Sequence, residues 1–480
     1  MAKKTYTILD YHRDTAHIRG AISGRTLDRS DVPHPFKVYR GVPTFHLAHD
    51  LALPDVPLDK ALTKRPLPEK ASMPHILAGI CNLTAGISQV RNSSEDTVFH
   101  FRTVASAGGL YPAELYMALQ KVNGMNDGLY HYSPLQHTLS HLRSGYVFGA
   151  LSGTKPIIRF FLTAIHHRSA WKYGPRAYRY CLLDAGHMAE NLRLAARIHG
   201  LPATLDYDFN DAFLARFLGI DEAYEGCLVQ VHSLGCKPDT EMDEEVPLTS
   251  EDIPIFSRCA AKAVAPEALA AVNRITATFA RCPVKSPTQS SEKTTPLPDP
   301  IVPASTPATI MSRRSRRNFV PRTAPTRDLV DIIGMVCRDV APACSSGLEV
   351  GFIASEQSGL KPGYHRINRG DCSTTLIKPG DLMPMAARAS LDQGWLENAA
   401  IHFVFTANLD ALNQQCGPRA YRYAHLEAGR LGQRIYLSAT AKQLGACGIG
   451  AFFDQEAASL FSLPQGHALL YLVAVGPIRK

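Results

Sequence analysis

A seven-residue segment, GPRAYRY, occurs twice in the chain, at residues 174–180 and again at residues 417–423, displaced by 243 residues (417 minus 174). The likeness continues on both sides at the same displacement. Phe160, Thr163, Ala164, Leu183, Ala185 and Gly186 correspond to Phe403, Thr406, Ala407, Leu426, Ala428 and Gly429. Solenoids of short repeats need three or more copies, whereas this pattern indicates two. We therefore predict an internally duplicated chain whose halves pack as two subunits do in a symmetric dimer.

Composition limits the class of protein. With 480 residues, 45% hydrophobic and 20% charged, the chain is long enough for two domains with separate cores. The net charge of +8 is dispersed, and the basic tracts lack interleaved aromatic residues, so we predict no nucleic-acid partner. The eleven cysteines include no Cys-x-x-Cys pair, so reduced thiols are expected, without a disulfide framework or metal site. No signal peptide or membrane span is evident, which predicts a cytoplasmic protein.

Changes in composition divide the chain into four parts. Residues 1–72 are an extension rich in proline and histidine, and residues 73–238 are the first copy. Residues 239–309 join the copies through an acidic stretch, one helix expected over 266–280, and an extended end rich in serine, threonine and proline. Residues 310–480 are the second copy.

Each repeated segment is predicted to begin a long helix. Pro175 and Pro418 have the fixed φ that suits a first helical turn. Over residues 177–199 the apolar side chains form one broad stripe, and Gly186 permits close approach of a neighbour. This pattern fits a core helix of one copy, and it fits equally a helix packed between the two copies.

Residues 313–319, at the start of the second copy, place four arginines around one serine. Arginine forks at alternate positions, with a hydroxyl between them, can bind one phosphate, and a helix beginning directly afterwards would add its dipole. A basic run beside a linker is more commonly a solvated patch. The run alone therefore leaves both interpretations open.

Two further segments are rich in small residues. Residues 105–116 place them before Leu-Tyr-Pro and a strand expected at 115–119, which allows either a close approach to a flat ligand or a simple turn. Residues 444–453 follow the long helix of the second copy, and their glycines permit backbone contact with a cofactor. They do not fit the dinucleotide fingerprint, which follows a strand, so a Rossmann site is not expected.

Together these segments resemble the nitroreductase-like FMN flavoprotein superfamily, and specifically its SagB-type branch, which includes thiazole- and oxazole-forming peptide dehydrogenases. In that family FMN lies at a dimer interface in an α+β fold. The resemblance therefore implies a nitroreductase-like α+β fold in each copy and an intramolecular pseudo-dimer that binds FMN. The segment Trp171-Lys172-Tyr173-Gly174, followed by Arg176, Tyr178, Arg179 and Tyr180, resembles the most specific motif of the branch.

The resemblance also implies site residues. It assigns azoline dehydrogenation to Lys172 and Tyr173, although the same pair would also serve to hold the loop before the long helix. A lysine beside a tyrosine suits proton transfer, because burial or a cationic neighbour can shift either pKa. The expected cofactor contacts are Ser106, Ala107, Gly108, Leu110, Tyr111 and Pro112 of the first copy, and Arg313, Ser315, Arg317, Gly448, Ile449, Gly450 and Arg479 of the second. His131, His166 and His167 are interpreted as surface or satisfied histidines.

The two copies have lost complementary parts of this pattern. The first lacks Arg-x-Ser-x-Arg and carries Pro202, Leu205 and Tyr207 opposite Gly445, Gly448 and Gly450. The second offers Cys344-Ser345-Ser346-Gly347-Leu348 opposite the 106–112 segment, and Gln415-Cys416 opposite Lys172-Tyr173. We therefore predict one good composite flavin site in a chain that needs no second subunit.

Three classes of function fit these residues. The first is a two-electron FMN dehydrogenase acting on a modified peptide, another heterocycle or a small metabolite. The second is a reductase that passes hydride from NAD(P)H to nitro or quinone compounds. The third is a non-catalytic flavin-binding protein, as partly degenerate duplicated chains can become.

Overall fold

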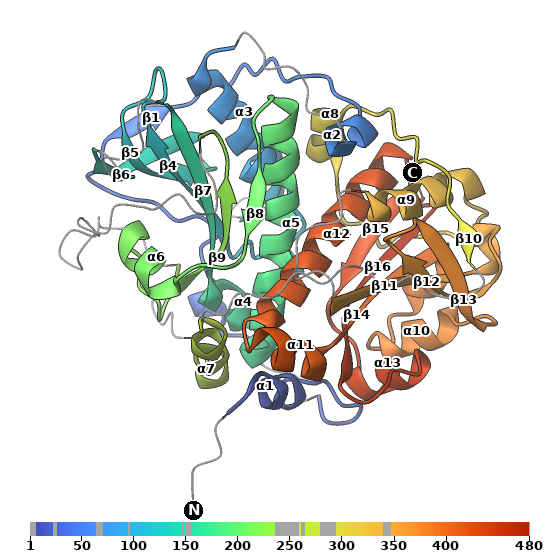
Figure 1. Cartoon of the computed structure of the whole chain (residues 1–480). Helices are drawn as coiled ribbons and strands as arrows, with labels where there is room; N and C mark the ends of the chain where they lie inside the picture. The colour runs from blue at the N-terminus through green and yellow to red at the C-terminus, as the bar shows by residue number, and fades with distance from the viewer. Residues whose placement is uncertain are drawn as a thin grey trace, which may run out of the picture.

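The chain folds into two units that share one topology (Figure 1). The computed structural model describes residues 6–22, 26–63, 71–94, 97–145, 147–148, 155–235, 259–260, 265–278, 294–338 and 347–479. Each unit is built on an antiparallel seven-stranded sheet with helices packed against it. The acidic stretch of the predicted linker and residues 344–346 of the second copy lie outside the described residues.

The two sheets have corresponding strand orders. The first sheet runs β1-β6-β5-β4-β7-β9-β8, with β1 Thr44–His46, β4 Ala113–Gln120, β5 Gly128–Ser133, β6 Thr138–Ser144, β7 Ile157–Ile165, β8 Thr204–Asp206 and β9 Glu225–His232. The second runs β10-β13-β12-β11-β14-β16-β15, with β10 Thr295–Pro296, β11 Leu348–Ala354, β12 Gly363–Asn368, β13 Ser373–Pro379, β14 Ile401–Asn408, β15 Gly445–Ile449 and β16 His467–Gly476. The order matches position by position, which confirms the duplication and the α+β fold.

The helices of the first half are α1 Ile8–Asp14, α2 Leu58–Thr63, α3 Met73–Ala85, α4 His166–Tyr173, α5 Ala177–Ile198 and α6 Asp211–Leu218. Those that follow are α7 Glu267–Thr276, α8 Thr306–Ser312, α9 Thr326–Cys337, α10 Met383–Ala389, α11 Leu409–Cys416, α12 Ala420–Ala441 and α13 Asp454–Leu460. Among the helices of the described ranges, none has both the length and the apolar character that a bilayer crossing requires.

The two repeated helices, α5 and α12, pack against each other at the centre of the molecule (Figure 1). A side chain on Gly186 would collide with the carbonyl oxygen of Leu426, and one on Gly429 would collide with that of Leu183. These glycines therefore let the helix backbones touch. The helix stripe serves the interface between the copies as well as the core, so the chain forms an intramolecular pseudo-dimer.

The arginines of the repeated segment join the two copies. Arg176 and Arg179 donate to Asp454 at the start of α13, over 2.9 and 2.8 Å. Their counterparts Arg419 and Arg422 donate in the same way to Asp211 at the start of α6. All four guanidinium groups are buried, and Asp211 and Asp454 are themselves separated by the repeat displacement. The arginine segment is thus repeated because the arginines of each copy bind the equivalent aspartate of the other copy.

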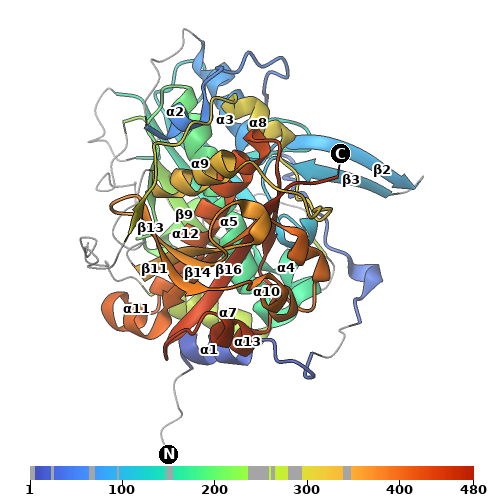
Figure 2. The ribbon, with the colours of Figure 1, turned by 90° about the vertical axis from the view of Figure 1, so that its right-hand side faces the viewer.

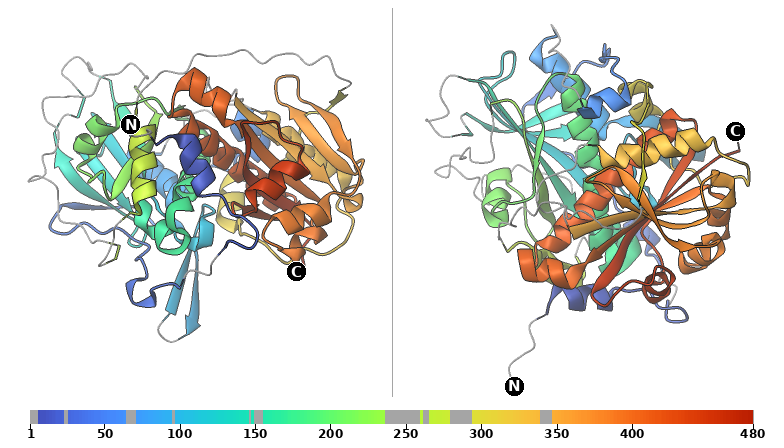
Figure 3. Two further views of the ribbon diagram at one scale, coloured as in Figure 1. Left: turned by 90° about the horizontal axis from the view of Figure 1, so that it is seen from below. Right: turned by 45° about the vertical axis from the view of Figure 1, so that its right-hand side comes forward.

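The predicted extension and linker take part in the fold. Strand β1 pairs with β6, and α1 lies beneath the junction of the two copies, as the view from below shows (Figure 3). The Tyr11 hydroxyl donates to the carbonyl oxygen of Pro175 over 2.6 Å. The helix expected over 266–280 is α7, shorter at both ends.

Helix α8 ends just before Arg313, and the next helix begins only at Thr326. The prediction of a helix directly after the arginine run is therefore wrong. Ser315 and Phe319 instead form β-bridges to Ala446 and Ile478. Strands β2 Ile87–Ser94 and β3 Thr97–Arg102 form a hairpin that projects from the body (Figure 2).

Cys416 is disulfide-bonded, so the expectation of reduced thiols is wrong for this residue.

Candidate functional site

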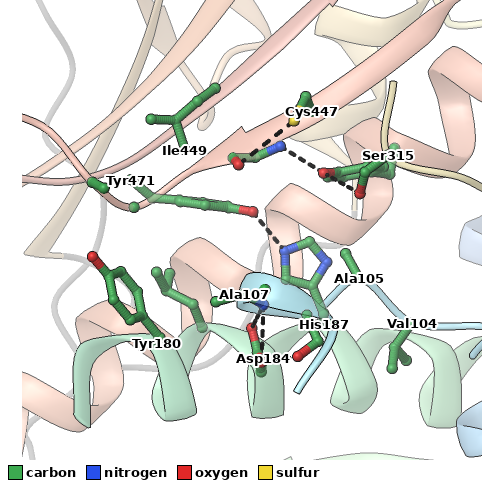
Figure 4. Close-up of a pocket in the computed structure, with 18 of the residues that line it drawn as sticks. Val104, Ala105, Ala107, Tyr180, Asp184, His187, Ser315, Cys447, Ile449 and Tyr471 are labelled. Atoms are coloured by element: carbon green, nitrogen blue, oxygen red, sulfur yellow. Dashed lines mark hydrogen bonds between the residues drawn. The ribbon is translucent and has the colours of Figure 1, made fainter. Parts of the chain in front are cut away.

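A pocket of about 480 Å³ lies between the two copies and is lined by both. We call it the interface pocket (Figure 4). Of the predicted site residues, it brings together Ser106, Ala107, Gly108, Tyr111, Lys172, Tyr173, Arg313, Ser315, Arg317, Gly448, Ile449 and Gly450. Its volume falls in the range of small-molecule sites, roughly 300–1,000 Å³. Segments far apart in the sequence therefore meet as the complementary losses predict.

Three predicted residues do not line this pocket. Pro112 is buried where the chain enters β4, and its carbonyl oxygen accepts from the Ile165 amide. Leu110 only closes the turn before it. Arg479 lines a separate pocket of about 520 Å³ together with Arg316 and Arg322. Its neighbour Ile478 packs over Gly445 and pairs with Phe319.

The loop from Ser106 to Tyr111 is held from below by Asp184 of α5. The Ser106 hydroxyl donates to Asp184 Oδ2 over 2.6 Å, and the Ala107 amide donates to the same carboxylate over 3.2 Å (Figure 4). Ser106 Oγ in turn accepts from the Tyr111 amide. Gly108 has a φ of +66°, and a Cβ there would lie 2.7 Å from the Tyr173 hydroxyl oxygen. The loop therefore needs glycine at this position for its conformation and for its contact with Tyr173.

Asp184 is a pocket residue that the sequence prediction missed. Burial raises the pKa of its carboxyl group to about 7, although the hydrogen bonds from Ser106 and Ala107 favour the charged form. A carboxyl group with such a pKa changes charge in the physiological range. Its position on the buried stripe of α5, where acidic residues are rare unless paired, is the feature that could have identified it.

Lys172 and Tyr173 stand together at the end of α4. Lys172 Nζ is 5.5 Å from the centre of the Tyr173 ring, and that ring meets the Tyr180 ring edge-on at 4.6 Å. Burial raises the pKa of Tyr173, and Tyr180 and Asp184 raise it further. The phenol is therefore neutral at physiological pH. Of the two effects that could bring one member of the pair into range for acid or base work, burial acts on Tyr173 in the opposite direction, because burial disfavours phenolate.

The Arg-x-Ser-x-Arg segment has one buried and one exposed arginine. Arg313 Nε donates to the Thr103 carbonyl over 2.9 Å, and Nη2 donates to the carbonyls of Arg102 and Val104. Its Nη1 is buried and has no hydrogen-bond partner among the described residues. The exposed Arg317 guanidinium lies 5.9 Å from the centre of the Trp395 ring. Arg313 thus links the second copy to the first, and its Nη1 group remains unpaired among the described residues.

Ser315 and the glycine segment share a tyrosine. The Tyr436 hydroxyl of α12 accepts from the Gly448 amide over 2.5 Å and lies 3.1 Å from Ser315 Oγ. A side chain on Gly448 would collide with Tyr471, and one on Gly450 would lie 2.5 Å from the Tyr180 ring. His131, His166 and His167 are absent from the pocket lining, and His131 contacts Glu114 over 2.9 Å.

At positions equivalent to the pocket lining under the pseudo-symmetry, larger side chains pack together or form ion pairs. Tyr207, which replaces Gly450, packs face to face with the Tyr423 ring at 6.1 Å. Glu427 and Arg430 replace Asp184 and His187 and form an ion pair of 2.6 Å. The counterpart of Tyr436 is Arg193, which forms an ion pair of 2.9 Å with Glu190; Glu190 also pairs with Arg430 and Arg434.

Comparisons with known proteins agree with this architecture. The Nitroreductase family model matches twice, over residues 60–232 and 310–477. The crystal structure of a protein from Anabaena variabilis, provisionally named a nitroreductase, covers 98% of this chain and 99% of its own, with a TM-score of 0.80 and 23% identity, so the whole fold is shared.

Two relatives, named for the processing of trifolitoxin and of microcin B17, support the SagB-type branch. The trifolitoxin-processing protein TfxB of Rhizobium leguminosarum bv. trifolii is 27% identical over 178 residues, 34% of this chain and 48% of that one. The microcin B17-processing protein McbC of Escherichia coli is 28% identical over 143 residues, 27% of this chain and 53% of that one. The chain thus spans about half the length of these relatives. With both halves matched, the chain belongs to the nitroreductase family as a tandem duplication.

Proposed function

We propose that this oxidoreductase binds one FMN in the interface pocket and oxidises a modified peptide by two-electron transfer. The observation that carries the proposal is the pocket itself, where the arginine-rich segment 313–317 of one copy meets the Lys172-Tyr173 pair of the other. When bound, FMN supplies the group that accepts hydride. The residues around it bind, orient and handle protons.

The residues present fit a flavin phosphate. A buried N–H group without a partner costs about 1–3 kcal/mol, and Arg313 Nη1 is such a group. A phosphate would satisfy it and would be reached by the Ser315 hydroxyl and the exposed Arg317 fork. Gly448 and Gly450 make room for the rings of Tyr471 and Tyr180, which line the pocket beside them.

Proton handling is assigned to the two residues beside the loop. Oxidation releases a proton as well as a hydride. The exposed Lys172 amine, in its neutral form, accepts that proton, while the neutral Tyr173 hydroxyl donates a hydrogen bond to the negative charge that develops on the substrate. Gly108 lets this pair approach the loop closely. A neutral phenol is also a proton donor for reduction, which is the specific observation in favour of the second candidate, an NAD(P)H-dependent nitro or quinone reductase.

The β2–β3 hairpin supports a peptide as substrate. Phe101 lines the interface pocket. Phe99 lies two residues along the same strand, hence on the same face, and is 52% exposed. An aromatic surface thus continues from the pocket wall out along the hairpin, which a long ligand can contact and a compact nitro compound cannot. The names of the two relatives, a trifolitoxin-processing protein and a microcin B17-processing protein, agree with this choice.

Anaerobic flavin bleaching tests the proposal. Purified protein should be yellow and contain about one FMN per chain, and an azoline-containing peptide should bleach it faster than NADH or NADPH. Bleaching by the nicotinamides alone would favour the reductase, and a flavin that none of these reduces would favour a non-catalytic protein. Colourless protein that cannot be reconstituted would contradict all three.

A further inference from the structure

A chain of hydrogen bonds runs from the interface pocket through both long helices into the first copy. The Tyr471 hydroxyl of β16 is 3.0 Å from His187 Nε2 (Figure 4). His187 Nδ1 is 2.7 Å from Gln433 Oε1. Gln433 Nε2 donates to Asn191 Oδ1 over 2.8 Å, and Asn191 Nδ2 donates to the Leu83 carbonyl over 3.1 Å. Both Tyr471 and His187 line the pocket.

The Leu83 carbonyl, at the inner end of this chain, fixes which group donates in each of its hydrogen bonds. A backbone carbonyl can only accept, so Asn191 must turn its amide nitrogen toward Leu83 and its oxygen toward Gln433. Gln433 must then donate to Asn191, which leaves its oxygen to accept from His187 Nδ1–H. Burial lowers the pKa of His187 to about 4, with Arg313 adding to the effect and the Gln433 hydrogen bond opposing it. The ring is therefore neutral, and its bare Nε2 accepts from Tyr471.

The Tyr471 hydroxyl thus donates its proton to His187 and not to a group in the pocket. Burial, with further contributions from Tyr436 and Asp184, raises the pKa of Tyr471 well above its ordinary value, so the group remains a phenol. Its oxygen retains lone pairs, and its only proton is already donated. Toward a ligand in the pocket, Tyr471 can then accept a hydrogen bond but not donate one without breaking the bond to His187.

We propose that Tyr471, oriented by His187 and Gln433, is a specificity residue that accepts a hydrogen bond from an N–H group of the ligand in the interface pocket. This inference rests on the proposed function, under which the donor is the ring imide N–H of FMN, the one ring N–H of oxidised isoalloxazine. The arrangement is confined to this site. Under the repeat, Leu228, Arg430 and Glu190 stand where Tyr471, His187 and Gln433 stand.

Titration of the full-length, flavin-free protein with FMN and with N3-methyl-FMN, followed by flavin fluorescence, tests the proposal. The wild type should bind FMN about tenfold more tightly than the methylated analogue, which lacks the donor. Tyr471→Phe should weaken FMN binding about tenfold and bring the two ligands to within twofold of each other. Tyr436→Phe is the matched control on the same pocket; it should preserve the preference for FMN.

The outcomes separate this inference from the proposed function. FMN binding with a preference that persists in Tyr471→Phe would overturn the inference and leave the function standing, and failure of the wild type to bind FMN would overturn both. Should Tyr471→Phe not fold, His187→Leu provides the second test. It removes the acceptor that orients the phenol, and a preference for FMN that does not fall in that variant would overturn the proposal.

Discussion

Asp184 and Glu427 occupy equivalent positions in the two copies but have opposite pKa shifts, which allows a paired test of the site electrostatics. Burial raises the pKa of Asp184 from its ordinary 3.8 to about 7. Burial acts in the same direction on Glu427, but Arg430 and Arg369 outweigh it and lower its pKa. We therefore expect Asp184→Asn and Glu427→Gln to respond differently to pH.

The expected size follows from linkage. The folded chain binds the Asp184 proton more tightly than the unfolded chain, so this group stabilises the wild type at low pH. That stability is lost as the pH rises toward 7, at about 1.4 kcal/mol for each pH unit. Asparagine does not titrate. The free energy of unfolding of Asp184→Asn, relative to the wild type, should thus rise by roughly 2.5 kcal/mol between pH 5 and pH 8.

The measurement is the difference in unfolding free energy between variant and wild type, from urea curves at pH 5, 6, 7 and 8. Glu427 is ionised in both states over this range, so Glu427→Gln should show a deficit of about 3–5 kcal/mol that does not vary with pH. A pH-independent difference for Asp184→Asn would refute the argument, because it would mean that the carboxyl group has an ordinary pKa in the folded chain.

Three further results are expected. Arg317→Ala should weaken FMN binding at least about tenfold, since a charge-assisted hydrogen bond contributes roughly 1.5–3 kcal/mol. Arg316→Ala, in the separate pocket, should leave FMN affinity unchanged. Equal effects of the two substitutions in fluorescence titrations would contradict the phosphate assignment. Tyr173→Phe should retain FMN and lower turnover by about 10²–10⁴, and an unchanged kcat would limit Tyr173 to a structural role. Phe99→Ser should raise KM severalfold for a peptide and leave KM for a quinone unchanged; a parallel rise for both would show that the hairpin does not distinguish long ligands.

The duplication was predictable because interface contacts require identical residues in both copies. Arg179 and Arg422 each reach an aspartate of the other copy, so the repeated letters record a geometric constraint. The residues that complete the pocket were harder to predict. Tyr436 and Tyr471 lie on buried elements whose pattern is that of a core, and only the assembled interface shows that their hydroxyl groups meet Ser315 and His187. Arg479 lines the separate pocket with Arg316, a placement that distance along the chain does not reveal.

Under the proposed function, fusion of two subunits allows one composite site to change without changing the other. In a homodimer, a tyrosine at the position of Gly450 would appear in both sites, whereas here Tyr207 occupies one site and Gly450 the other. The region equivalent to the interface pocket holds a buried charged cluster in which Glu190 pairs with Arg193, Arg430 and Arg434. Removing one partner from such a cluster leaves a buried charge unpaired, at a cost of several kcal/mol. Reopening the second site would require several simultaneous substitutions, so the asymmetry of the chain is stable against single mutations.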